Sequence, residues 1–124
     1  DWLTIHGSLD KGKPSDKHKY YALLEGAKLF INTTPSWNAF QATLEAMYFY
    51  TPIVSRSNES LVQTFPELEG FSYIVEERNK DLEKEIIKSL ECKEQYLEKC
   101  ENSHKAVKPY TWENFTQKLV GLFE

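Results

Sequence analysis

The strongest constraint on how this chain folds is a predicted helix that ends before a proline and is followed directly by a strand. Residues 37–49 carry apolar side chains at helical spacing: Phe40, Leu44, Met47 and Tyr48. Pro52 ends this helix, because proline cannot continue a helix and biases the residue before it toward extended geometry. A short buried strand follows at residues 53–55. Glu45 is the only acid on this helix, and we expect its carboxylate to bind a ligand.

The same alternation of strand and helix runs through most of the chain. We expect strands at residues 2–6, 29–31, 53–55 and 71–75, separated by helices, and only helices after residue 80. Short continuous apolar strands between helices favour an α/β fold, with a parallel sheet covered by helices on both faces and a helical C-terminal end. In such sheets, ligands bind beyond the carboxyl ends of the strands.

Length and charge narrow the class of protein. A chain of 124 residues allows one domain, and it opens without an initiator Met or a signal peptide, so we interpret residues 1–124 as a single partial domain of a longer protein. The net charge of −4 argues against nucleic acid as a partner, because phosphate binding needs a basic face. No apolar run reaches the length of a membrane span.

The two cysteines indicate a compartment. Cys92 and Cys100 fall in one predicted helix, where eight residues at ~1.5 Å each separate them by roughly 12 Å, too far for a disulfide. Two free thiols predict a cytoplasmic protein, a prediction compatible with peripheral association at the inner membrane surface.

Four segments follow one another in an order that a known family shares: IHG before a helix with paired tyrosines (residues 5–21), AKLFI running into TPS (27–36), LEAM followed by TPIV (44–54) and YTWE (110–113). In this order and spacing, the chain resembles the C-terminal, donor-binding domain of GT-B glycosyltransferases. The family is that of the retaining group 1 glycosyltransferases, which includes sucrose, glycogen and many bacterial polysaccharide transferases.

The resemblance implies a hexosyltransferase-type enzyme with a Rossmann-like half of the GT-B fold. Such an enzyme transfers a sugar from a nucleoside diphosphate sugar to a glycan, lipid or protein acceptor, with retention. The acceptor-binding N-terminal domain of the protein would be a partner of this chain, and without it the fragment is expected to be inactive. The resemblance implies neither a metal nor a cofactor, because these enzymes lack a metal-binding Asp-x-Asp motif, as does this chain.

The resemblance also assigns roles to residues. Glu45 matches the glutamate that holds the ribose diol of the donor, and a carboxylate can accept two hydrogen bonds from a vicinal diol. The start of its helix would offer backbone N–H groups to the diphosphate, which makes donor-binding candidates of four residues: Ala39, Phe40, Gln41 and Thr43. Asn38 is the candidate for the catalytic position near the donor sugar.

Departures from the family pattern leave a second reading open. Counting back to the family's first acid lands on Trp37, and Asn38 takes that place only if the turn is one residue shorter. An asparagine carries no negative charge, and Tyr50 stands where the family has a glycine. The alternative is therefore a catalytically inactive glycosyltransferase-like partner protein. An unrelated flavodoxin-like or response-regulator-like domain is disfavoured, because residues 1–14 contain neither an acidic cluster nor a phosphate loop.

Overall fold

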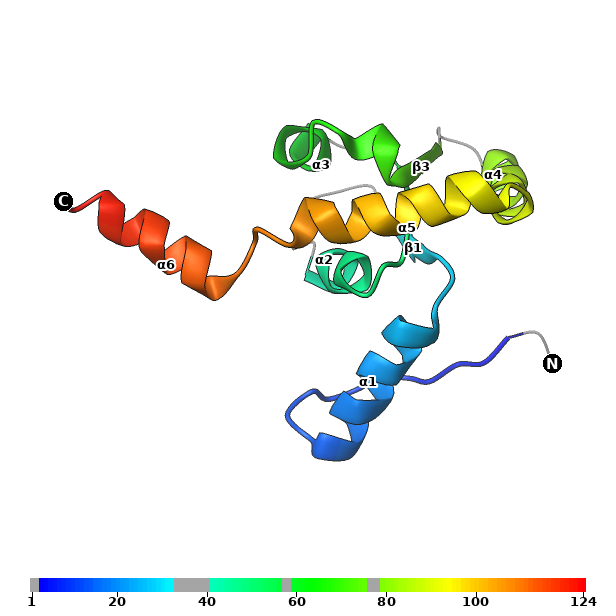
Figure 1. The fold of residues 1–124 in the computed structure, drawn as a ribbon. Coiled ribbons are helices and arrows are strands. Elements are labelled where there is room, and N and C mark those ends of the chain that lie inside the picture. The colour runs from blue at the N-terminus through cyan, green and yellow to red at the C-terminus, as the bar shows by residue number, and fades with distance from the viewer. Residues whose placement is uncertain (1–2, 33–40, 57–58, 76–78) are drawn as a thin grey trace.

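The structure is a computed structural model, and it describes residues 3–32, 41–56, 59–75 and 79–124. A small sheet forms its centre, with helices packed around it (Figure 1). In chain order the elements are α1 (Pro14–Gly26), β1 (Phe30–Asn32), α2 (Gln41–Tyr48), β2 (Ile53–Arg56), α3 (Glu59–Thr64), the 3-10 helix η1 (Leu68–Gly70), β3 (Ser72–Val75), α4 (Asn79–Glu91), α5 (Lys93–Val107) and α6 (Trp112–Gly121).

The sheet has three parallel strands in the order β1-β2-β3. Phe30 of β1 pairs with Ile53 of β2, which pairs in turn with Ser72 of β3. Each pair of neighbouring strands is joined by a helical connection, as parallel pairing requires. The expectation of an α/β fold with a parallel sheet is therefore confirmed.

Different helices cover the two faces of the sheet. One face carries the larger apolar cluster, which includes residues of α2, α3 and α5: Met47, Ile53, Leu61, Phe65, Leu68, Phe71 and Val107. The other face carries a smaller cluster, which two side chains of α4 join: Val54, Tyr73 and Val75, with Leu82 and Ile86. Because successive strand residues point to opposite faces, neighbouring residues of β2 belong to different clusters. Coverage of both faces confirms that part of the expectation as well.

The expected strand at residues 2–6 is not formed by the residues of it that are described. Residues 3–10 have no regular secondary structure, and Leu3 and Ile5 are exposed. Apolar alternation makes a strand only where a neighbouring strand offers a ladder of hydrogen bonds, and within the described ranges these residues have no such neighbour. This prediction was wrong for a physical reason that composition does not reveal.

The end of α2 is a tight turn with a left-handed residue. Tyr50 has φ +61°, its N–H donates to the Met47 carbonyl oxygen (3.0 Å), and the Thr51 N–H donates to the Ala46 carbonyl oxygen (3.1 Å). These two bonds are those of a Schellman motif, in which a glycine usually takes the left-handed position. A side chain there costs about 1–2 kcal/mol.

Contacts from α5 hold this strained turn. The His104 ring stacks on the Tyr50 ring, with centroids 4.1 Å apart and planes 4° apart. His104 also donates from Nδ1 to the Tyr48 carbonyl oxygen (2.7 Å), one of the orphan carbonyls at the helix end. The tyrosine is therefore kept in a glycine-like conformation by packing from another helix.

The last helix, α6, stands away from the rest of the molecule (Figure 1). Thr111 caps it, accepting a hydrogen bond from the Asn114 N–H (3.2 Å). None of its residues is buried, and Trp112 is 83% exposed. This helix therefore does not pack on the sheet.

We predict that Tyr50→Gly is more stable than Tyr50→Ala. Both variants lose the stack on His104, so the difference between them isolates backbone strain. Alanine at a positive φ keeps the strain, whereas glycine removes it, and we expect a gap of about 1 kcal/mol in the free energy of unfolding. Denaturant titration of the two variants measures this gap. An alanine variant as stable as the glycine variant would show that the turn is not strained.

Candidate functional site

The candidate site lies where α2 begins, near the carboxyl end of β1. Asn32, the last residue of β1, donates from its side-chain amide to the hydroxyl of Thr43 (3.3 Å), and Thr43 is buried. This contact ties the first turn of α2 to the edge of the sheet at which parallel α/β folds bind ligands. Glu45 lies one helical turn after Gln41, the first residue of α2, on the side that faces α1.

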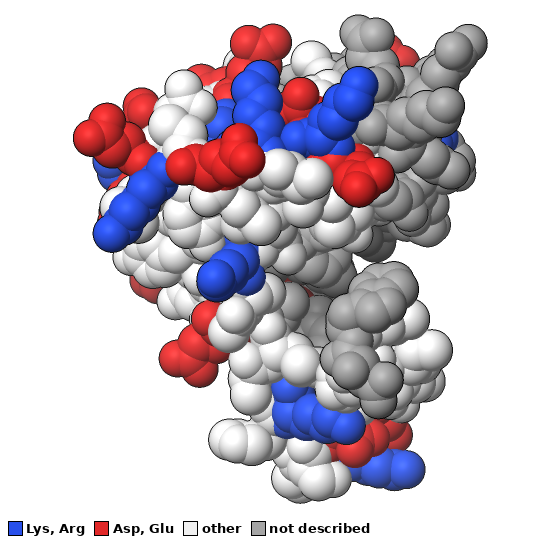
Figure 2. Space-filling model, turned by 90° about the vertical axis from the view of Figure 1, so that its right-hand side faces the viewer, with Lys and Arg blue, Asp and Glu red and all other residues white. Residues whose placement is uncertain are grey.

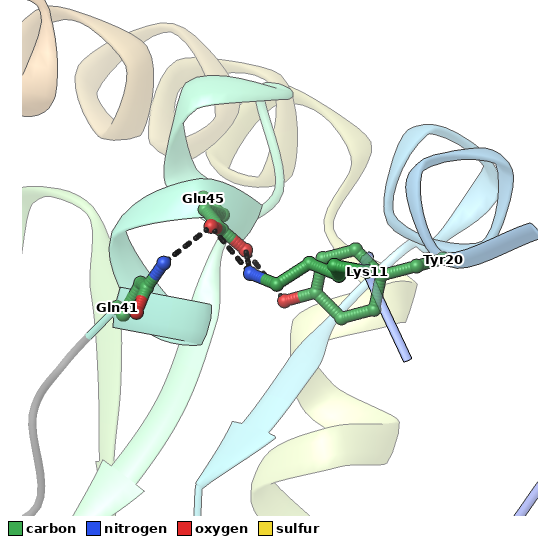
Figure 3. Close-up of polar contacts among 4 residues, drawn as sticks. All are labelled: Lys11, Tyr20, Gln41 and Glu45. Atoms are coloured by element: carbon green, nitrogen blue, oxygen red, sulfur yellow. Dashed lines mark hydrogen bonds and ion pairs between the residues drawn. The ribbon is translucent and has the colours of Figure 1, made fainter. Parts of the chain in front are cut away.

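Three side chains surround the carboxylate of Glu45 (Figure 3). Tyr20 donates its hydroxyl to Oε2 at 2.6 Å. The Lys11 ammonium contacts both oxygens, Oε1 at 3.0 Å and Oε2 at 3.3 Å. The Gln41 amide donates to Oε1 at 3.1 Å. Since a carboxylate offers about four lone-pair sites, these contacts use its full capacity.

Each donor comes from a different part of the chain. Lys11 lies in a turn where Asp10 accepts hydrogen bonds from the backbone of Gly12 through its side chain (2.9 Å) and of Lys13 through its carbonyl (2.9 Å). Tyr20 lies on α1, and Gln41 lies one turn before Glu45 on α2. The site therefore exists only when the N-terminal turn, α1 and α2 are packed together.

The electrostatics of the cluster favour an ionised glutamate. Burial by itself raises the pKa of Glu45, but the hydrogen bonds from Tyr20, Lys11 and Gln41, together with the charge of Lys11, outweigh it and lower the pKa below its ordinary value. Burial raises the pKa of Tyr20, and the hydrogen bond to Glu45 and its charge raise it further. Both shifts describe one arrangement, in which a neutral phenol donates to a carboxylate.

Only some of the site residues predicted from the sequence come together in the structure. Glu45 and Gln41 come together, with Glu45 20% exposed at its side chain and Gln41 exposed. Thr43 points to β1 and its hydroxyl is engaged there. The remaining candidates, Asn38, Ala39 and Phe40, lie outside the described residues. The pairing of Glu45 with a lysine is also what an acid with a purely structural role would show.

Sequence reasoning did not foresee Tyr20 and Lys11 as partners of Glu45. In the sequence, Lys11 is one of several lysines in a polar loop, and Tyr20 is one of the paired tyrosines in the family resemblance. They lie 34 (Lys11) and 25 (Tyr20) residues away in the chain, so no local spacing announces either contact. The one available signal is the turn of residues 7–15, which would lie at the same edge of the sheet as the start of the helix if residues 2–6 formed a strand of that sheet.

Charged side chains are mixed over the face shown in Figure 2. Lysines and arginines alternate there with acids, and the residues drawn in colour or white form no continuous basic patch. Within the described ranges, no cluster of three or more His, Cys, Asp or Glu side chains has the geometry to hold a metal ion. Over the same ranges, none of the helices has both the length and the apolar character needed to cross a membrane.

No model of a known protein family, no curated protein and no solved structure matches this chain. What the site can do is therefore inferred from its residues and their geometry. Its central feature is an ionised, partly exposed carboxylate, which is an acceptor for hydroxyl, amide or ammonium donors.

We predict that Glu45→Gln lowers stability in a pH-dependent way. The amide loses the charge-assisted bonds, so the variant should unfold about 1–2 kcal/mol more easily at pH 7. Because the pKa of Glu45 is lowered in the folded state, its contribution is present above the unfolded value of about 4.3 and is lost as the pH falls through the folded value. The stability curves of wild type and variant should therefore converge in acid.

Glu83→Gln is the matched control for this experiment. Glu83 is exposed on α4, and in the described part of the chain it makes no hydrogen bond or ion pair. This variant should follow the wild type at every pH. A Glu45→Gln curve that runs parallel to the wild type down to pH 3 would contradict the proposed ionised state.

Proposed function

We propose that this chain is the donor-binding domain of a retaining glycosyltransferase of the GT-B type. The enzyme transfers a sugar from a nucleoside diphosphate sugar to a glycan, lipid or protein acceptor. Glu45 binds the ribose diol of the donor, and the start of α2 meets the diphosphate. The order of the sequence segments and the parallel α/β fold with Glu45 near the carboxyl edge of the sheet both support this proposal.

One observation carries the proposal: the Lys11 ammonium touches both oxygens of the Glu45 carboxylate, at 3.0 and 3.3 Å. A vicinal diol that binds a carboxylate through its two hydroxyls takes this same bidentate position. A diol would therefore compete with the Lys11 ammonium for this position on the carboxylate.

The occupant of that position is replaceable. The side chain of Lys11 is 36% exposed and hangs on a flexible stem, so its ammonium can move into solvent or toward a phosphate. Two diol hydroxyls would restore the hydrogen bonds that the carboxylate loses. The exchange of Lys11 for a diol then costs little free energy, because the Glu45 carboxylate accepts hydrogen bonds before and after it.

The exposed face of α6 supports the proposal that a further domain of the protein packs on this one. Trp112 of α6 is 83% exposed, and Leu122 and Phe123, directly after α6, are 81% and 85% exposed. Several large apolar side chains exposed along one segment are typical of an interaction site. In the proposed enzyme, the acceptor-binding N-terminal domain is the partner that α6 contacts.

The second candidate is an inactive glycosyltransferase-like protein that stabilises or positions an active paralogue. The full occupancy of Glu45 by Lys11, Tyr20 and Gln41 favours it, because a carboxylate with every acceptor site filled also serves as a structural link between α1 and α2. In that case, removal of Glu45 lowers stability and has no effect on nucleotide binding.

We predict that the full-length protein binds one nucleotide of a panel of UDP, GDP, ADP and their common sugars. Glu45→Ala should weaken that binding by ~2–3 kcal/mol, roughly thirtyfold to a hundredfold, because it removes the bonds to the diol. Isothermal titration calorimetry with both proteins measures the effect, and Glu83→Ala on α4 serves as the control that should bind like the wild type.

Each outcome of this titration decides between the candidates. Nucleotide binding that Glu45→Ala leaves unchanged would exclude the ribose role. Silence across the whole panel, from protein that unfolds cooperatively and is therefore folded, would favour the inactive partner.

A further inference from the structure

We propose that Tyr20 is a positioning residue, which holds the Glu45 carboxylate in the orientation that binds a vicinal diol. This inference rests on the proposed donor-binding function. It adds a residue on α1 to a site whose candidates from the sequence resemblance all lie within residues 38–45.

Tyr20 differs from the other two donors in how firmly it is held. Its bond to Oε2, at 2.6 Å, is the shortest of the contacts around the carboxylate. The Tyr20 ring is half-buried and packs edge-on against Tyr21, with centroids 5.4 Å apart. Gln41, in contrast, is exposed, and the Lys11 ammonium ends a flexible side chain. Only two rotatable bonds separate the ring of a tyrosine from the backbone, so the Tyr20 hydroxyl is the best-fixed donor of the cluster.

A fixed donor on one oxygen determines the orientation of the whole carboxylate group. The terminal torsion of a glutamate is broad, so a single rigid contact on Oε2 restricts a rotation that the side chain itself leaves free. When a diol takes the position of Lys11, Tyr20 remains on Oε2 and both oxygens stay turned toward the ligand. Burial raises the pKa of Tyr20 and the bond to Glu45 raises it further, which agrees with a neutral phenol that donates to the carboxylate.

The ring of Tyr20 also contacts the Lys11 ammonium. The Lys11 ammonium lies 4.7 Å from the centroid of the Tyr20 ring, within cation–π range. Tyr20→Phe keeps this ring contact and the contact with Tyr21, and it removes only the hydroxyl. The variant therefore isolates the bond to Glu45.

The chain supplies a matched control in the adjacent residue. Tyr21 lies on the same helix, is half-buried, and contacts Tyr20 and Phe49 through its ring. Its hydroxyl makes no hydrogen bond to the described part of the chain, so Tyr21→Phe removes an equal number of atoms without touching Glu45.

The test compares two ligands on three full-length proteins: wild type, Tyr20→Phe and Tyr21→Phe. The ligands are the member of the UDP, GDP and ADP panel that binds the wild type best and its 2′,3′-dideoxy analogue, which lacks the diol. We expect Tyr20→Phe to weaken the ribonucleotide about tenfold and to leave the dideoxy analogue within twofold of the wild type. Tyr21→Phe should change neither, and thermal unfolding checks that each variant is folded.

Other outcomes overturn the inference in distinguishable ways. Equal weakening of both ligands by Tyr20→Phe would mean that Tyr20 only supports the fold. An unchanged Tyr20→Phe, alongside a Glu45→Ala that still loses the ribonucleotide, would remove Tyr20 from the site and leave the proposed function standing. Binding of no nucleotide by the wild type would overturn the proposed function and the positioning role together.

A second measurement does not depend on the stability of Tyr20→Phe. In wild type with ¹³C-labelled tyrosine, we expect the ring carbon of Tyr20 that bears the hydroxyl to keep its hydrogen-bonded NMR chemical shift when the ribonucleotide binds. Movement of that resonance to the value of a solvent-exposed tyrosine would show that the hydroxyl leaves Glu45 and would contradict the inference.

Discussion

The turn between α2 and β2 is the constraint on which the other contacts depend. Its left-handed residue and Pro52 reverse the chain directly into the central strand, which is buried on both faces. The buried hydroxyl of Thr51, in the same turn, lies within 3.4 Å of the carbonyl oxygens of Leu24 and Ala27, so it also anchors the end of α1. A change in this turn would therefore move both helices that form the carboxylate cluster.

The cluster shows how a partly buried carboxylate is kept ionised. A carboxylate withdrawn from water needs donors on all its acceptor sites, and here two neutral donors and one cation supply them. Of the two charged members, Lys11 is the more exposed at its side chain, with 36% against 20% for Glu45. The cluster is compatible with a structural link between α1 and α2 and, on the proposed function, with a binding site in which a ligand replaces Lys11.

The parts of the fold that depend on local chemistry were predictable. Apolar spacing and a proline stop predicted the end of α2 to within one residue and the start of β2 at Ile53. Parallel strands followed from short apolar runs between helices. The residues 3–6 could not be judged in this way, because a strand is decided by its neighbour and not by its own pattern. The partners of Glu45 were unpredictable for the same reason, since the approach of α1 to α2 is a tertiary event.

Tyr50 changes how the departures from the family pattern should be weighed. A glycine at that position is explained by a left-handed backbone, and the tyrosine of this chain has the same backbone, with φ +61°. The stack on His104 offsets the strain that the side chain brings. A tyrosine where the family pattern has a glycine is therefore compatible with the left-handed turn that a glycine favours. On the proposed function, the choice between an enzyme and an inactive partner then depends on the acid that the family pattern has before this helix, and on whether a diol displaces Lys11 from Glu45.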